Sequence, residues 1–178
     1  MKREKLNPLE KSWILYDVGN SAFVLLCSTL LPIYFNALAT AGGLSEDLYL
    51  SYWSYAGSIA TILVAFIGPV CGAMADQKGF KKPIFLLCLA LGAIGCAALG
   101  IAWSWLVFLV IFVIAKVGYS SSLVFYDSML PEITTEDRMD NVSSLGYAFG
   151  YIGSVIPFLL CLALVLFGES FGLSMGNA

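Results

Sequence analysis

The chain has 178 residues, of which 60% are hydrophobic and 12% are charged, and its formal net charge at pH 7 is −3. An average soluble domain carries about 25% charged residues, so a chain of this composition has too little polar surface to stay dissolved. The composition therefore excludes a soluble globular domain. It predicts an all-α membrane protein.

Five apolar stretches are each long enough to cross the hydrocarbon core of a membrane, which takes roughly 20 helical residues. The first stretch is too long for a cleavable signal peptide and carries Asp17 and Asn20 near its start, so we expect it to be retained. The expected transmembrane spans are Trp13 to Leu38, Ser51 to Ala73, Pro83 to Ala102, Ser104 to Ser128 and Val142 to Phe167.

Positive charge lies in alternate hydrophilic segments. Segments before span one, between spans two and three, and between spans four and five hold Lys or Arg, and the other three hold none. Because Lys and Arg stay on the cytoplasmic side, this predicts a cytoplasmic N-terminus and an outer location for residue 178. The residues concerned are Lys2, Arg3, Lys5, Lys11, Lys78, Lys81, Lys82 and Arg138.

Polar residues share one face of the first span. Asp17, Asn20, Ser21 and Ser28 follow at helical spacing, so this face is expected to look inward. Ionisable groups inside a membrane usually line a cavity or find a partner, because exposure to lipid costs several kcal/mol. Asp17 and Asn20 are therefore candidate gate or cavity residues, with a structural cap near the interface as the alternative for Asp17.

The segment 72–82, between spans two and three, combines glycine with charge. A simple hairpin needs a turn and some positive charge, which leaves Gly72 and Asp76 unexplained. The pattern Gly-x3-Asp-x2-Gly-x-Lys-Lys resembles the loop between the second and third helices of the major facilitator superfamily, although Gln77 stands where a basic residue is usual. The resemblance implies a gating role for Gly72, Asp76, Gly79, Lys81 and Lys82.

In that superfamily this loop docks the N-terminal half against the C-terminal half, with the acidic residue facing a helix N-terminus. Pro131-Glu132 and Arg138 resemble the acidic-then-arginine pattern after the fourth helix of superfamily members. An ion pair between Asp76 and Arg138 is the resulting hypothesis. The alternative is a solvated acidic loop.

Lys116 lies near the middle of the fourth span, too deep for its stem to reach either interface easily, and it needs an anion. Asp127 shares its helical face but is about 16 Å further along the axis, so the two cannot pair directly. The partner of Lys116 is either a substrate carboxylate, such as that of an amino acid, or an acidic residue elsewhere in the protein. Asp17 and Asp127 are also candidate proton-coupling residues.

Small residues recur every four positions in two spans. Gly146, Gly150 and Ser154 do so in the fifth span, which also contains Gly153, and a second set does so in the third span. Such stripes indicate close helix contact, which we prefer here over a substrate path. The second set consists of Gly92, Cys96 and Gly100.

Three stretches resemble one branch of the superfamily: the start of span one (13–23), the end of span four (125–132) and the start of span five (142–153). That branch is the vacuole-effluxer-like family, which includes the autophagy-related vacuolar amino-acid effluxer. The resemblance implies a six-helix half built as two inverted triplets. The sixth helix of this half, and then a C-terminal half, would follow this sequence, and the alternative is a natural five-helix protein. For the bacterial members it implies the inner membrane.

The resemblance also implies a secondary transporter that works by alternating access on a small polar solute, with amino acids as cargo and export as direction. The alternative is a membrane scaffold, assembly factor or receptor on the same helices. We expect no enzyme, since the chain has no histidine and no catalytic or phosphate-binding motif. We also expect no cofactor, no metal, since no CxxC pair occurs, and no nucleic-acid partner; the partners are lipid, a small solute and the C-terminal half.

Overall fold

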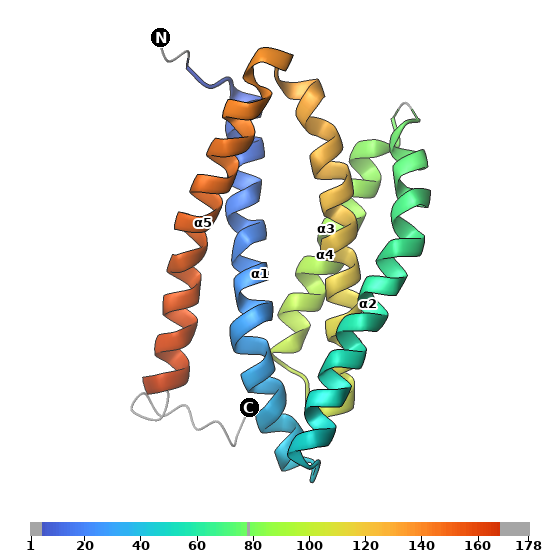
Figure 1. Ribbon diagram of the computed structural model, residues 1–178, viewed down its shortest axis with the longest axis vertical. Coiled ribbons are helices and arrows are strands. Elements are labelled where there is room, and N and C mark those ends of the chain that lie inside the picture. The colour runs from blue at the N-terminus through green and yellow to red at the C-terminus, as the bar shows by residue number, and fades with distance from the viewer. Residues whose placement is uncertain (1–4, 78, 168–178) are drawn as a thin grey trace. The chain divides into compact units, whose positions relative to one another are not determined.

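The computed structural model of the chain describes residues 5–77 and 79–167 (Figure 1). These residues form five α-helices and no strand. All five helices are long and apolar enough to cross a membrane, which confirms the expected all-α membrane fold. The helices are α1 (Pro8–Ala41), α2 (Glu46–Ala75), α3 (Lys81–Leu99), α4 (Trp105–Ile133) and α5 (Glu136–Phe167).

Several helices extend beyond the spans expected from hydropathy. Helix α1 begins five residues before Trp13, and α5 begins six residues before Val142. Hydropathy marks only the apolar part of a helix, whereas capping residues decide where the helix starts. Pro8 occupies the first position of α1, where a missing N–H costs nothing. With 34 residues, α1 is about 50 Å long, so its ends extend beyond a hydrocarbon core of about 30 Å.

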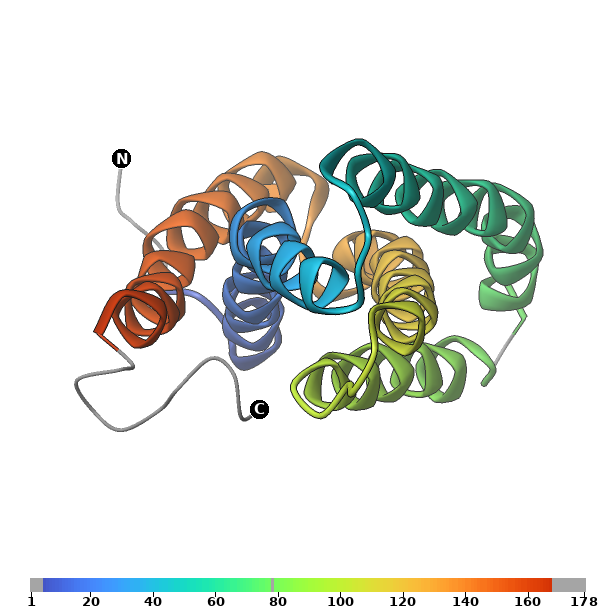
Figure 2. The ribbon, with the colours of Figure 1, turned by 90° about the horizontal axis from the view of Figure 1, so that it is seen from below.

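The described chain divides into two compact units. The first contains residues 5–30 and 128–167, in which α5 runs beside the first part of α1 in the same direction (Figure 1). The second contains residues 31–77 and 79–127, in which α4 lies between α2 and α3 (Figure 2). Helix α4 is also the most buried span, at 39% against 17% for each of the others.

Aromatic rings form the core of the second unit. Phe35 stacks on Trp53 and on Phe108, with ring centroids 5.6 and 5.8 Å apart, and Trp53 lies 4.4 Å from the ring of Phe112. Phe35, Phe108 and Phe112 are fully or almost fully buried. Because such rings are large and rigid, they fix the end of α1 against α2 and α4.

Helices α3 and α4 approach each other through small residues. A Cβ atom added to Gly118 would lie 2.7 Å from the backbone nitrogen of Gly92, and one added to Gly95 would lie 2.8 Å from the Cβ of Ala115. The contact therefore uses Gly92 and Gly95, whereas the expected four-residue stripe named Cys96 and Gly100. Gly100 lies beyond the last residue of α3 and is exposed.

Candidate functional site

The polar face of α1 lies directly against the glycines of α5 in the first unit. A Cβ atom on Gly146 would lie 2.8 Å from Cζ3 of Trp13 and 3.3 Å from Oδ2 of Asp17. A Cβ atom on Gly150 would lie 2.6 Å from Oγ of Ser21 and 3.3 Å from the same Asp17 oxygen. The Asp17 carboxylate thus lies next to both glycines, and a side chain at either position would crowd it.

Gly153 continues this contact one turn further along α5. A Cβ atom at Gly153 would overlap Val18, three of whose side-chain atoms lie within reach. Because a β-branched side chain has few rotamers, Val18 cannot move aside easily. This geometry supports the helix-contact role that the sequence suggested for these three glycines.

Asp17 and Asn20 form a polar pair inside α1. The Asn20 side chain hydrogen-bonds to the Asp17 carboxylate. The Oδ1 atom of Asn20 is buried and has no hydrogen-bond partner in the part of the chain that the structure describes. Ser28, expected on the same face, is exposed and donates to the carbonyl of Val24 over 2.9 Å.

Lys116 lies half-buried on α4 in the second unit. Its ammonium nitrogen is 5.8 Å from the ring centroid of Phe112 and 3.8 Å from the position that a Cβ atom of Gly57 on α2 would take. Within the described residues Lys116 forms no ion pair. Asp127, the other charged candidate of this helix, is exposed eleven residues further along.

The loop between α2 and α3 begins at the C-cap of α2. The N–H of Asp76 donates to the carbonyl of Gly72, and the Asp76 side chain is exposed. Gly79 has φ +87°, a left-handed conformation that favours glycine. Lys81 and Lys82 are the first two residues of α3. Lys78 lies outside the described residues.

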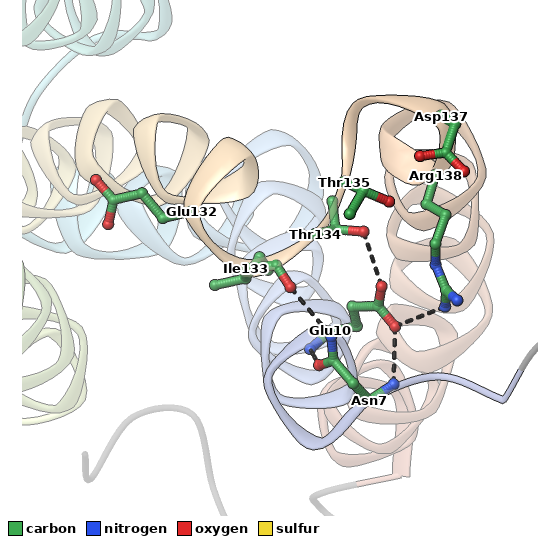
Figure 3. A pocket seen from close by; sticks show the side chains of 8 residues that line it. All are labelled: Asn7, Glu10, Glu132, Ile133, Thr134, Thr135, Asp137 and Arg138. Atoms are coloured by element: carbon green, nitrogen blue, oxygen red, sulfur yellow. Dashed lines mark hydrogen bonds and ion pairs between the residues drawn. The ribbon is translucent and has the colours of Figure 1, made fainter.

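The structure also contains a polar cluster that the sequence did not predict, at the start of α1 (Figure 3). Glu10 is only 1% exposed, and its carboxylate accepts hydrogen bonds from the N–H of Asn7 at 2.8 Å, the hydroxyl of Thr134 at 2.8 Å and Nη2 of Arg138 at 2.9 Å. Figure 3 shows Thr134 and Arg138 directed toward Glu10, while Asp137 points away.

The cluster borders an open pocket of about 440 Å³. Asn7 and Glu10 form a reciprocal capping box, because the Glu10 N–H also donates to Oδ1 of Asn7 over 2.8 Å. The Asn7 amide in turn donates to the carbonyl of Ile133 over 3.1 Å. These bonds tie the start of α1 to the connection between α4 and α5. The pocket is lined by Asn7, Glu10, Glu132, Ile133, Thr134, Thr135, Asp137 and Arg138.

The cluster keeps Glu10 ionised. Burial raises the pKa of Glu10, but the N–H of Asn7, the hydroxyl of Thr134 and the guanidinium of Arg138 together lower it more, so the pKa lies below its ordinary value of 4.5. Glu10 precedes the apolar part of α1, which begins at Trp13, and therefore belongs to the end of the helix rather than to its membrane-spanning part.

Arg138 forms an ion pair with Glu10. Asp76, the partner suggested by the sequence, belongs to the other compact unit. Its pairing with Arg138 stays a prediction.

A family model described as "Vacuole effluxer Atg22 like" matches residues 46–175, which is more than half of the chain. The chain belongs to the vacuole effluxer Atg22-like family. The resemblance noted in the sequence is thereby confirmed. The Atg22-like match covers α2 to α5 and includes the loop at 72–82 as well as Lys116.

Two relatives extend this result. The chain is 36% identical over 164 residues to the "Uncharacterized MFS-type transporter YxiO" of Bacillus subtilis (strain 168), and 22% identical over 150 residues to an uncharacterized protein of Aquifex aeolicus (strain VF5). These matches cover 90% and 83% of this chain but only 38% and 36% of the relatives. No solved structure matches. Together with the five apolar helices, the names indicate an integral membrane protein of the MFS transporter type.

Proposed function

We propose that the protein containing this chain is a secondary active transporter that moves a small polar solute across a membrane by alternating access. One observation carries the proposal. An ionisable residue, Asp17, and an amide, Asn20, lie together inside an apolar helix, against a neighbouring helix that presents glycines. Polar groups inside a membrane segment cost several kcal/mol when exposed to lipid and mark pathways for solutes or protons.

The family supports a direction and a cargo for this transport. The name "vacuole effluxer" supports export, and the resemblance to a vacuolar amino-acid effluxer supports amino acids. The distribution of Lys and Arg supports a cytoplasmic N-terminus, and the bacterial relatives support the inner membrane.

The loop at 72–82 has the features of a gate under this proposal. Asp76 and Lys82 are exposed at the end of the α2–α3 hairpin, where they are available to a second group of helices. The left-handed Gly79 allows the sharp turn that presents them. We propose that Gly72, Asp76, Gly79, Lys81, Lys82 and Arg138 close the cytoplasmic side during transport.

The direct test is solute counterflow. The protein produced from the complete reading frame is reconstituted in liposomes loaded with a mixture of the twenty common amino acids, and entry of each labelled amino acid is measured. We expect exchange of at least one amino acid and a large loss of exchange in Asp17→Asn.

Asp140→Asn is the matched control, because Asp140 is an exposed carboxylate at the start of α5. Correctly folded protein that exchanges none of the amino acids would contradict amino-acid transport. Equal exchange by Asp17→Asn and wild type would remove the role of Asp17.

A further inference from the structure

We infer that Lys116 binds the carboxylate of the transported solute, on the side of α4 that faces Gly57 of α2. The inference rests on the proposed transport function and narrows it to solutes that carry an anionic group. It depends on contacts among four residues of the second unit: Trp53, Gly57, Phe112 and Lys116.

Lys116 lies too deep in the membrane to serve only as a surface charge that orients its helix. It lies eleven residues, or about 16 Å, from the start of α4, which is roughly the middle of a 30 Å hydrocarbon core. Half-buried and without an ion pair in the described residues, the ammonium carries an uncompensated charge where desolvation is expensive. An anion that arrives and leaves would compensate this charge during each transport cycle.

The aromatic core holds Lys116 in place. Phe112 lies one turn before Lys116 on α4, is 2% exposed and contacts Trp53 of α2. With the Lys116 nitrogen 5.8 Å from its ring centroid, Phe112 provides an attractive face for the cation without neutralising it. The ammonium is therefore positioned but keeps its charge available for a ligand.

Gly57 lies next to this charge and places no side chain between it and α2. It lies one turn after Trp53 on α2, and a Cβ atom there would come within 3.8 Å of the ammonium nitrogen. Any longer side chain at this position would occupy the approach to Lys116. The hydroxyls of Ser58 and Thr61, near Gly57 on α2, donate to carbonyls of their own helix over 2.9 Å each. Their hydrogen atoms are therefore not available to an anion bound at Lys116.

Binding and transport can be measured separately. The protein from the complete reading frame is purified in detergent, and its melting temperature is recorded with each of the twenty common amino acids, with acetate and with inorganic phosphate. The amide of the most stabilising amino acid, which lacks the carboxylate, is then compared with the acid. A ligand that binds only the folded state raises the melting temperature in proportion to its affinity.

We expect stabilisation by the acid and none by its amide. Lys116→Gln should weaken binding by at least about tenfold, since a hydrogen bond to a charged group contributes about 1.5 to 3 kcal/mol. Lys116→Arg, which keeps the charge, should retain part of the binding. Gly57→Glu should abolish binding, because it places a carboxylate beside the ammonium. Ser54→Ala, on the exposed surface of the same helix, is the matched control.

Three results would overturn the inference. The first is equal stabilisation by the acid and its amide. The second is the absence of any shift with every anion tested. The third is a lower melting temperature of ligand-free Lys116→Gln, because that would show that Lys116 has a permanent acidic partner elsewhere in the protein. If the protein binds the carboxylate but shows no amino-acid counterflow, this result would instead contradict the proposed transport function alone.

Discussion

Nη2 of Arg138 donates to the carboxylate of Glu10 over 2.9 Å and joins residues 128 positions apart in the sequence. The pair lies where the end of α4 meets the starts of α1 and α5. A carboxylate that is 1% exposed and also accepts bonds from Asn7 and Thr134 is fully engaged in this contact. The pair is therefore a buried polar connection within the first unit.

Replacing Glu10 tests that connection. Glu10→Gln should lower the free energy of unfolding by about 1 to 3 kcal/mol, because Arg138 loses its charged partner and the capping box is weakened. Unfolding in mixed micelles, followed by circular dichroism, measures the change. Glu136→Gln, an exposed acid in the first turn of α5, is the control and should change stability by less than about 0.5 kcal/mol. Equal effects of the two substitutions would contradict the structural role of Glu10.

The same pair predicts a dependence on pH. The pKa of Glu10 is lower in the folded state than its ordinary value of 4.5, so ionised Glu10 stabilises the fold above pH 4.5. This contribution falls as pH decreases from 4.5 through the lowered pKa, because the unfolded chain takes up the proton first. The stability difference between wild type and Glu10→Gln should thus be constant from pH 7 to 5 and shrink below 4.5. A difference that grows at acidic pH would refute this assignment.

The contact between α1 and α5 predicts a difference between two glycines. Gly153→Ala should destabilise the protein by about 1 to 3 kcal/mol, because the added methyl group overlaps the stiff Val18 side chain. Gly19→Ala, on α1, meets no atom within 4 Å and should be neutral or stabilising by up to about 1 kcal/mol, as usual for glycine inside a helix. Thermal unfolding measures the stability of both variants. If Gly19→Ala were less stable than Gly153→Ala, the helices α1 and α5 would not approach each other as described.

Charge reversal tests the observed partner of Arg138, Glu10, and the proposed partner, Asp76, separately. Each of the substitutions Asp76→Arg and Arg138→Asp should reduce amino-acid counterflow, and their combination should restore it if the two residues pair during gating. Glu10→Arg with Arg138→Glu should instead restore part of the stability that either single reversal removes, because this swap keeps an ion pair but not the bonds that Glu10 accepts from Asn7 and Thr134. If the Asp76 double variant stays inactive although it folds, the gating pair should be abandoned.

The sequence predicted the number and type of the helices because each apolar stretch is long enough to cross a membrane. It did not predict the start of α1, although Asn7 and Glu10 have the spacing of a capping box, because hydropathy places the boundary at Trp13. The bond between Glu10 and Arg138 lacked any local signal. It depends on how α1 and α5 meet, and residues 128 positions apart carry no spacing rule.

The small-residue stripes were only partly predictable. In α5, the contact with α1 uses residues 146, 150 and 153, whereas the expected four-residue stripe continued from 150 to Ser154. In α3, the contact uses Gly92 and Gly95, three residues apart, because α4 crosses along that row of the helix surface. A sequence shows that close contact is possible, whereas the crossing of the partner helix decides which row is used. Asp17 and the glycines of α5 were likewise identified separately, and only the structure brings them together.

The Glu10 cluster also bears on how the protein is made. Glu10 is synthesised long before Thr134 and Arg138, and at about 5 to 20 residues per second the ribosome needs roughly 6 to 26 seconds to add the 128 intervening positions. During this interval the carboxylate has no tertiary partner and must stay hydrated. The start of α1 is therefore held at the water interface while α1 to α4 insert, and it becomes fixed only when α5 emerges.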